Sequence, residues 1–248
     1  MKVVALHGFT GSGADFAPLA DRLSVPLLAL DLIGHGEAPA PKDPAAYRMS
    51  AQVEYLADQL GDNDLVVLGY SLGGRVALRL WPRLEARLRG MILISANPGI
   101  IDPVDRAERM AQDHALAGQI EEEGIEWFCR HWSQQPLIKT QAGIAEPIRA
   151  QMERRRLQNR AIGLAHTLRS AGQGAADPVW DQLEHVAVPC LVMTGALDPK
   201  YCDIGERMAR QMPRGFHQTV ERVGHCAHLE DIETSAAAID RFVRGLSE

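Results

Sequence analysis

The sequence predicts an α/β fold with a mostly parallel central sheet, flanked by helices and carrying an inserted helical cap. Short apolar runs, each followed by turn residues, have the length of buried strands. They span residues 3–6, 26–31, 65–69, 91–96, 190–195 and 217–223. Amphipathic patterns such as "DFAPLADRL" and "SAQVEYLADQL" separate them. Strands that alternate with helices need crossover connections, which make the sheet parallel and cover both of its faces.

The alternation of strands and helices stops after Asn97. From residue 98 to residue 177 the pattern is helical, with charged residues on one side of each segment and apolar residues on the other. We therefore predict a core of residues 1–97 and 178–248 and a helical cap insertion of residues 98–177. A cap over the carboxyl ends of the strands would close a pocket at the usual ligand position of such sheets.

Composition and charge narrow the class of partner and the compartment. The chain has 248 residues and a formal charge of -6 without an acidic tail, which argues against nucleic acid as a partner. Its four cysteines lack a C-x-x-C pair, which predicts free thiols in a reducing compartment. Only four apolar residues follow Lys2, too few for a secretory or membrane segment. We expect a cytoplasmic protein without membrane contact; the sequence does not indicate its oligomeric state.

A serine stands at the apex of a predicted strand-to-helix turn. "LVVLG" and "YSLGGRVALRL" form a strand, a tight turn at Ser71 and a helix that we expect to end at Pro82. Gly69, Ser71 and Gly73 match G-x-S-x-G, in which the strained turn lifts the hydroxyl and flanking side chains would collide with the strand and helix. The alternative is an ordinary glycine-rich turn whose serine caps the helix.

Two later residues complete a catalytic triad in the chain order serine, aspartate, histidine. Asp198 follows the strand at 190–195, and His225 follows the last strand. We expect His225 to take the proton of Ser71 and Asp198 to hold the imidazole in its working tautomer. The loop "LHGFTGSG" lies where such folds place an oxyanion donor, so the amides of Phe9 and Leu72 are predicted to form the oxyanion hole.

The remaining histidines of interest have simpler explanations. His35, His217 and His228 are interpreted as structural. A metal site at His225, Cys226 and His228 is disfavoured, because adjacent ligands do not easily converge and no further partner has the right spacing.

With Ser71, Asp198 and His225 in this order, the chain resembles the α/β-hydrolase superfamily over its whole length. Further motifs, "GYSLGGRVAL", "ANPGI", "RAER", "HWSQQPL", "RRRLQNRAIGLAHTLRSAGQG", "TGALDPK" and "GHCAHLE", resemble the menaquinone-pathway 2-succinyl-6-hydroxy-2,4-cyclohexadiene-1-carboxylate synthases. The resemblance implies a lyase, without a cofactor, that removes a proton from a succinyl-bearing polycarboxylate and eliminates pyruvate.

The same resemblance implies a set of substrate-binding side chains. Its arginines match Arg75, Arg109 and Arg156, and further pocket positions match Tyr70 and Trp132. Guanidinium groups suit carboxylates because they form two parallel hydrogen bonds.

The residues alone support these arginines unequally. Arg75 lies four residues after Ser71 on one helix face, although a surface arginine with a buried stem would show the same pattern. Arg109 and Arg156 alone look like solvated helix charges. Arg154 and Arg155 leave the third assignment open by a residue.

Two rival functions remain open at this point. A carboxylesterase or thioesterase would use the same triad, although an apolar acyl chain gains nothing from three arginines. A ligand-binding relative would keep the pocket without turnover. Turnover of p-nitrophenyl acetate would favour the esterase.

Overall fold

The architecture was derived from a computed structural model that describes residues 1–246. Within these residues, a single sheet of six parallel strands has the order β2-β1-β3-β4-β5-β6. The strands are β1 (Lys2–Leu6), β2 (Leu27–Leu30), β3 (Leu65–Tyr70), β4 (Leu88–Ile94), β5 (Cys190–Gly195) and β6 (Gly215–Val220). The strand order reverses between β1 and β3, so the loops after these two strands diverge and leave a crevice at their carboxyl ends.

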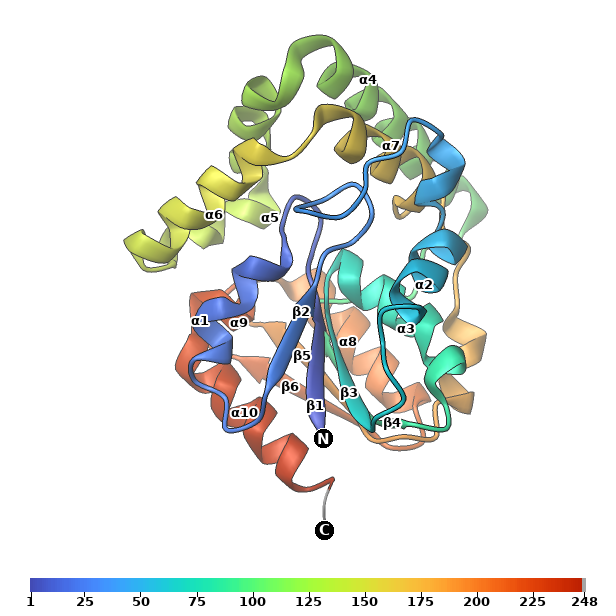
Figure 1. The fold of residues 1–248 in the computed structure, drawn as a ribbon, viewed down its shortest axis with the longest axis vertical. Helices are drawn as coiled ribbons and strands as arrows, with labels where there is room; N and C mark the ends of the chain where they lie inside the picture. Colours follow the sequence, from blue (N-terminus) through green and yellow to red (C-terminus); the bar gives the residue numbers. More distant parts are fainter. Residues whose placement is uncertain (247–248) are drawn as a thin grey trace.

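The two faces of the sheet divide the core by the period of two that strands impose. In β1, Val4 and Leu6 pack with helices on one face, whereas Val3 and Ala5 pack with helices on the other. The first face is covered by α2 (Met49–Ala57), α3 (Leu72–Leu84) and α8 (Pro199–Gln211). The second is covered by α1 (Ala17–Ala20), α9 (Ala227–Glu230) and α10 (Ile232–Arg244). Figure 1 shows the α1, α9 and α10 layer on the left and the α2 and α3 layer on the right.

Between β4 and β5 the chain forms a layer of helices at the carboxyl ends of the strands, at the top of Figure 1. Its α-helices are α4 (Pro103–Ser133), α5 (Pro136–Lys139), α6 (Glu146–Gln158) and α7 (Ala161–Ala171). The long α4 is interrupted at Gly124, whose φ of 81° and ψ of 180° are not helical. A small separate cluster that includes Phe128 and Leu164 packs α4 against α7.

Most sequence expectations for the fold are confirmed. The six strands and the flanking helices form close to where the sequence predicts them. The largest differences are in β4, which begins three residues and ends two residues earlier than predicted, and in β6, which begins two residues and ends three residues earlier. The prediction that α3 ends at Pro82 was wrong, since the helix continues to Leu84. Pro82 lies in the last turn, where its ring removes one hydrogen bond without ending the helical dihedral angles. The exact bounds of the cap, 98–177, stay a prediction.

Two further properties bear on the compartment. The four cysteines Cys129, Cys190, Cys202 and Cys226 are free. Within residues 1–246, none of the helices combines the length and the hydropathy that crossing a membrane would require.

Candidate active site

Ser71 stands between β3 and α3 in a strained backbone conformation. Its φ is 50° and its ψ is -105°, which an L-residue rarely adopts, and its N–H donates to the Ile94 carbonyl at 2.9 Å. The flanking glycines are required sterically. A Cβ on Gly69 would lie 2.6 Å from the Gly73 oxygen, and one on Gly73 would lie 2.1 Å from the Leu6 oxygen. The turn therefore presents the Ser71 hydroxyl at the carboxyl ends of the strands.

The three predicted triad residues form one hydrogen-bonded chain. His225 Nε2 lies 3.0 Å from Ser71 Oγ, and His225 Nδ1 lies 2.7 Å from Asp198 Oδ2. His225 follows β6 and Asp198 follows β5, and both side chains are buried. Because the Asp198 carboxylate accepts a hydrogen bond from the Nδ1–H group, the proton of the neutral ring stays on Nδ1. Nε2 is then the acceptor that faces the serine hydroxyl.

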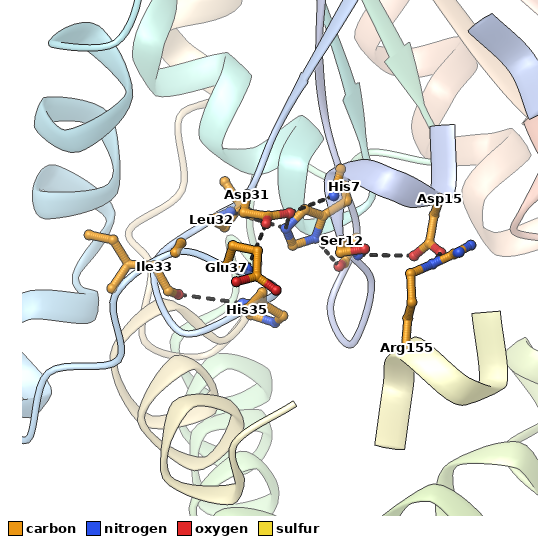
Figure 2. A network of polar contacts seen from close by, with 12 residues as sticks. His7, Ser12, Asp15, Asp31, Leu32, Ile33, His35, Glu37 and Arg155 are labelled. Carbon is orange, nitrogen blue, oxygen red and sulfur yellow. Dashed lines mark hydrogen bonds and ion pairs between the residues drawn. The ribbon is translucent and has the colours of Figure 1, made fainter. Parts of the chain in front are cut away.

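Of the two predicted oxyanion donors, Leu72 directly follows Ser71, and Phe9 follows Gly8, on which an added Cβ would lie 3.5 Å from Ser71 Cβ. Leu72 is the first residue of α3, so its N–H has no partner within the helix. Phe9 follows β1 in a loop that His7 supports. The Leu32 N–H donates to His7 Nε2 at 3.0 Å, which leaves the proton on Nδ1 to donate to the Gly8 carbonyl at 2.8 Å. Burial lowers the pKa of His7, so its imidazole is held neutral in this tautomer. Figure 2 shows the His7 ring close to Asp31 and Leu32.

A cavity of about 710 Å³ opens onto Ser71, a volume in the range of small-ligand sites. It lies between the sheet and the helices α4 to α7. Of the predicted site residues, all except Asp198 line it, and Asp198 stands behind His225. The lining members are Phe9, Tyr70, Ser71, Leu72, Arg75, Arg109, Trp132, Arg156 and His225.

Arg75 is a buried cation with unused hydrogen-bonding capacity. Its side chain donates from Nη2 to the Ala171 carbonyl at 3.1 Å, while its Nε has no partner among residues 1–246. Burial lowers the pKa of Arg75 to about 10, with a further lowering from Arg109 and an opposing effect of Tyr201 and Asp113. A cation in such surroundings binds an anion strongly, because its own solvation has already been lost.

The cap contributes the other two arginines. Arg109 Nε donates to Asp113 Oδ1 at 2.8 Å. Its two terminal amino groups have no hydrogen-bond partner among residues 1–246, so they are free to bind a ligand. Arg156 is buried and donates to Thr10 Oγ1 at 3.2 Å and to Gln141 Oε1 at 3.1 Å. The structure favours Arg156 over its neighbours, since Arg155 pairs with Asp15 and neither Arg154 nor Arg155 lines the cavity.

Two aromatic residues of the predicted site line the same cavity. Trp132 packs edge-on against Phe9 at a centroid distance of 5.4 Å, and its buried Nε1 has no partner in the described part of the chain. Tyr70 lies 5.5 Å from the His225 ring. Burial raises the pKa of Tyr70 well above its usual value, which keeps its hydroxyl protonated.

Sequence comparison identifies the family of this fold and triad. Residues 3–238 match the model of the "Alpha/beta hydrolase family". The chain belongs to the alpha/beta hydrolase family. A relative from Bacillus subtilis (strain 168), named "Putative 2-succinyl-6-hydroxy-2,4-cyclohexadiene-1-carboxylate synthase", is 34% identical over an alignment of 248 positions that covers 98% of this chain and 90% of the relative.

Two further similar proteins support a closer grouping. The 2-succinyl-6-hydroxy-2,4-cyclohexadiene-1-carboxylate synthase of Photorhabdus laumondii subsp. laumondii is 30% identical over 97% of this chain and 84% of its own length. The solved structure of MenH from S. aureus superimposes with a TM-score of 0.92 and 27% identity, covering 100% of this chain and 95% of that one. Within the family, the chain therefore groups with these synthases.

Sequence reasoning missed several side chains of the site. Tyr201 lies edge-on to the His225 ring at 4.4 Å and accepts a hydrogen bond from Gln173 Nε2 at 2.8 Å. Its position three residues after Asp198 was the available signal, because one turn of α8 returns to the same helix face. Asp113, the partner of Arg109, is four residues away on α4 and could have been found in the same way.

The histidines interpreted as structural differ in their surroundings. His217 lies 2.8 Å from Thr194 Oγ1 on the neighbouring strand, and His35 is fully buried outside the cavity lining. His228 also lines the cavity and stacks on Phe16 at 5.2 Å. Burial and then His225 lower the pKa of His228 to about 3, so it is neutral at physiological pH.

Proposed function

We propose that this protein is a 2-succinyl-6-hydroxy-2,4-cyclohexadiene-1-carboxylate synthase of menaquinone or phylloquinone biosynthesis. It would be a carbon–oxygen lyase that eliminates pyruvate from a polycarboxylate cyclohexene substrate. One observation carries the proposal: a hydrogen-bonded Ser71–His225–Asp198 triad opens into the same cavity as three arginines. The relatives named for this activity add support.

The arginines suit a small ligand with several carboxylates. Arg75 is buried, and no carboxylate among residues 1–246 bonds to it, so an anionic group of the substrate would neutralise it. Arg109 and Arg156 reach the cavity from the cap, on α4 and α6. Carboxylates bound between the core and the cap would fix the substrate against the serine, with Tyr70 and Trp132 as further contacts.

The triad would act as a base rather than a nucleophile. In the proposed step Ser71 Oγ takes a proton from a substrate carbon next to a carbonyl while His225 takes the hydroxyl proton of Ser71. The electron pair left on the carbon moves into the carbonyl as an enolate and then expels the pyruvate unit as its carbon–oxygen bond breaks. The imidazolium, stabilised by Asp198, returns its proton to the leaving group.

The developing enolate charge explains the oxyanion donors in a lyase. N–H groups of Phe9 and Leu72 would donate to the carbonyl oxygen as it becomes negative, which lowers the barrier to proton removal. The chemistry is proton transfer within the chain's own residues and calls for no cofactor. We further propose that segment 98–177 is the cap that excludes water, and that a chain with four free thiols works in the reducing cytoplasm.

The test follows pyruvate release from substrate generated in situ by the preceding pathway enzyme. Wild type is compared with Ser71→Ala and Arg75→Ala, with the spontaneous release measured without enzyme. We expect rapid pyruvate formation in the wild type and its loss in both variants. Pyruvate at the spontaneous rate in the wild type would refute the synthase activity.

The preformed triad geometry also favours a second candidate, a carboxylesterase or thioesterase, since the same contacts activate a serine for attack on a carbonyl. That reaction would pass through a covalent acyl-enzyme. Fast turnover of p-nitrophenyl acetate, or an acyl adduct on Ser71 with the substrate, would favour the hydrolase. Absence of both activities would leave a ligand-binding protein.

A further inference from the structure

The loop that carries Phe9 closes as a strained four-residue turn. The Gly11 N–H donates to the Gly8 carbonyl at 3.1 Å, which makes residues 8–11 a β-turn. Thr10 occupies the third position with a φ of 73°. A positive φ at this position is the type II requirement, for which glycine is the favoured residue, and a β-branched residue rarely adopts it.

The cap holds this turn through residues that lie far away in the chain. Asn159, directly after α6, donates from Nδ2 to the Thr10 carbonyl at 2.9 Å. Arg156 Nε donates to Thr10 Oγ1 at 3.2 Å. Thr10 is 4% exposed and Asn159 is 8% exposed, so water does not offer an equivalent donor to the Thr10 carbonyl. Two buried hydrogen bonds from the end of α6 thus stabilise the unfavourable conformation of Thr10.

A second connection between the same elements lies nearby. Arg155 Nε donates to Asp15 Oδ1 at 2.7 Å, and the other oxygen of that carboxylate accepts the Ser12 N–H at 2.9 Å. Figure 2 shows Arg155 reaching from the cap toward Asp15, with His7 on the far side of the loop. The loop is therefore held by the core through His7 and by the cap through the end of α6.

The turn geometry controls the direction of the Phe9 N–H. The Gly8 carbonyl and the Phe9 N–H belong to one planar trans peptide unit, so they point in opposite directions. That carbonyl accepts two hydrogen bonds, from His7 Nδ1 at 2.8 Å and from the Gly11 N–H. Relaxation of Thr10 to a negative φ reorients the Phe9–Thr10 peptide. If the turn then opens, the bond from Gly11 is lost, and the Gly8–Phe9 peptide with its N–H is held by His7 alone.

We propose that Asn159 is a positioning residue for the oxyanion hole: its bond to the Thr10 carbonyl keeps the turn strained and the Phe9 N–H aimed beside Ser71. The inference rests on the proposed function, in which this N–H stabilises the enolate. Asn159, the last residue of the "RLQN" motif, then has a role in addition to that of Arg156. It also makes the second oxyanion donor depend on docking of the cap.

The first experiment measures pyruvate release by Asn159→Ala and compares kcat with KM. Removing one oxyanion donor outright costs about 10²–10³ in kcat, so a donor that is only misdirected should cost at least about tenfold. KM should change by less than about threefold, because the N–H acts in the transition state. Arg149→Ala is the matched control: Arg149 lies on the same helix, bonds to the Ala142 carbonyl within the cap, and should leave kcat at the wild-type value.

A double-mutant cycle separates positioning from general damage to the cap. Glycine adopts a positive φ without strain, so Thr10→Gly removes the need for Asn159. We expect Asn159→Ala to lower kcat by less than about threefold in the Thr10→Gly background. Equal losses in the two backgrounds, or an unchanged kcat in Asn159→Ala alone, would overturn the inference.

A second readout keeps this result distinct from failure of the proposed function. Paraoxon modifies an activated serine: Ser71 Oγ bonds to phosphorus, p-nitrophenolate leaves, and the hydroxyl proton passes to His225. The reaction uses the oxyanion hole but not the arginines or the natural substrate. If wild type releases no pyruvate, the synthase proposal fails. Nitrophenolate release is measured for the wild type, Asn159→Ala, Thr10→Gly and the double variant. Asn159→Ala must slow it in the wild-type background and slow it less in the Thr10→Gly background. A rate that Asn159→Ala leaves unchanged would overturn the inference by itself.

Discussion

Replacement of Arg75 by methionine should affect activity and stability in opposite directions. A methionine fills the arginine's volume but removes the cation from beside Ser71. If a substrate carboxylate accepts two charge-assisted hydrogen bonds from Arg75, each worth about 1.5–3 kcal/mol, the loss is about 3–6 kcal/mol. At 1.4 kcal/mol for each factor of ten, kcat/KM for pyruvate release should fall by about 10²–10⁴.

The stability effect follows from the lowered pKa of Arg75. Burial lowers it from the usual arginine value to about 10, and a lowering of this size corresponds to about 3 kcal/mol of destabilisation in the folded enzyme. Loss of the bond to the Ala171 carbonyl offsets about 1–2 kcal/mol of that gain. Since the folded-state pKa is the lower one, the cost is complete below pH 10 and shrinks as the pH rises above 10.

Arg75→Met should therefore raise the free energy of unfolding by about 1–2 kcal/mol at pH 7, measured by urea denaturation without ligand. Addition of substrate or a polycarboxylate product should stabilise the wild type and leave the variant unchanged. A variant that is both less active and less stable would refute the idea that Arg75 is an uncompensated cation waiting for an anion.

Three further predictions concern the triad, the cap and pH. Asp198→Asn should lower kcat for pyruvate release by about 10³–10⁴ while the protein stays folded, because His225 loses the carboxylate that sets its tautomer; a fall of less than tenfold would contradict the triad. Arg156→Ala should raise KM at least about tenfold, whereas Arg154→Ala, on the exposed face of the same helix, should leave KM unchanged; equal effects would remove Arg156 from the site. His228 is neutral when folded and has a pKa of 6.5 when unfolded, so its contribution to stability is lost as pH falls from 6.5 toward 3. His228→Leu should remove about 2 kcal/mol of the stability difference between pH 7 and pH 5 in urea unfolding, and an unchanged difference would show that His228 does not titrate in this way.

The predictable parts of this protein are those whose signal is local in the sequence. A short apolar run predicts a strand. The glycines two residues before and two residues after Ser71 predict its turn. Asp198 and His225 were found because each directly follows a strand, and parallel strands bring such positions to one edge of the sheet. The functional roles of these residues remain predictions.

The contacts of the cap could not be predicted in the same way. Asn159 and Thr10 are 149 residues apart, and nothing in "RLQN" or "FTGSG" indicates that they meet. Arg109 looks like a solvated helix charge until α4 is placed over the sheet, where Asp113 is buried beside it. Such pairs depend on how the cap helices pack on the sheet, which neither propensity nor periodicity encodes.

The bend in α4 sets the dimensions of the ligand site. Arg109 and Trp132 belong to this one helix, on opposite sides of Gly124, and both line the cavity. In a straight helix, at 1.5 Å per residue, they would lie about 35 Å apart, too far to share a space of about 710 Å³. The bend at Gly124 thus allows one helix to place both Arg109 and Trp132 in the lining of the cavity. The backbone angle at Gly124 therefore helps to set how large a molecule the cavity can accept.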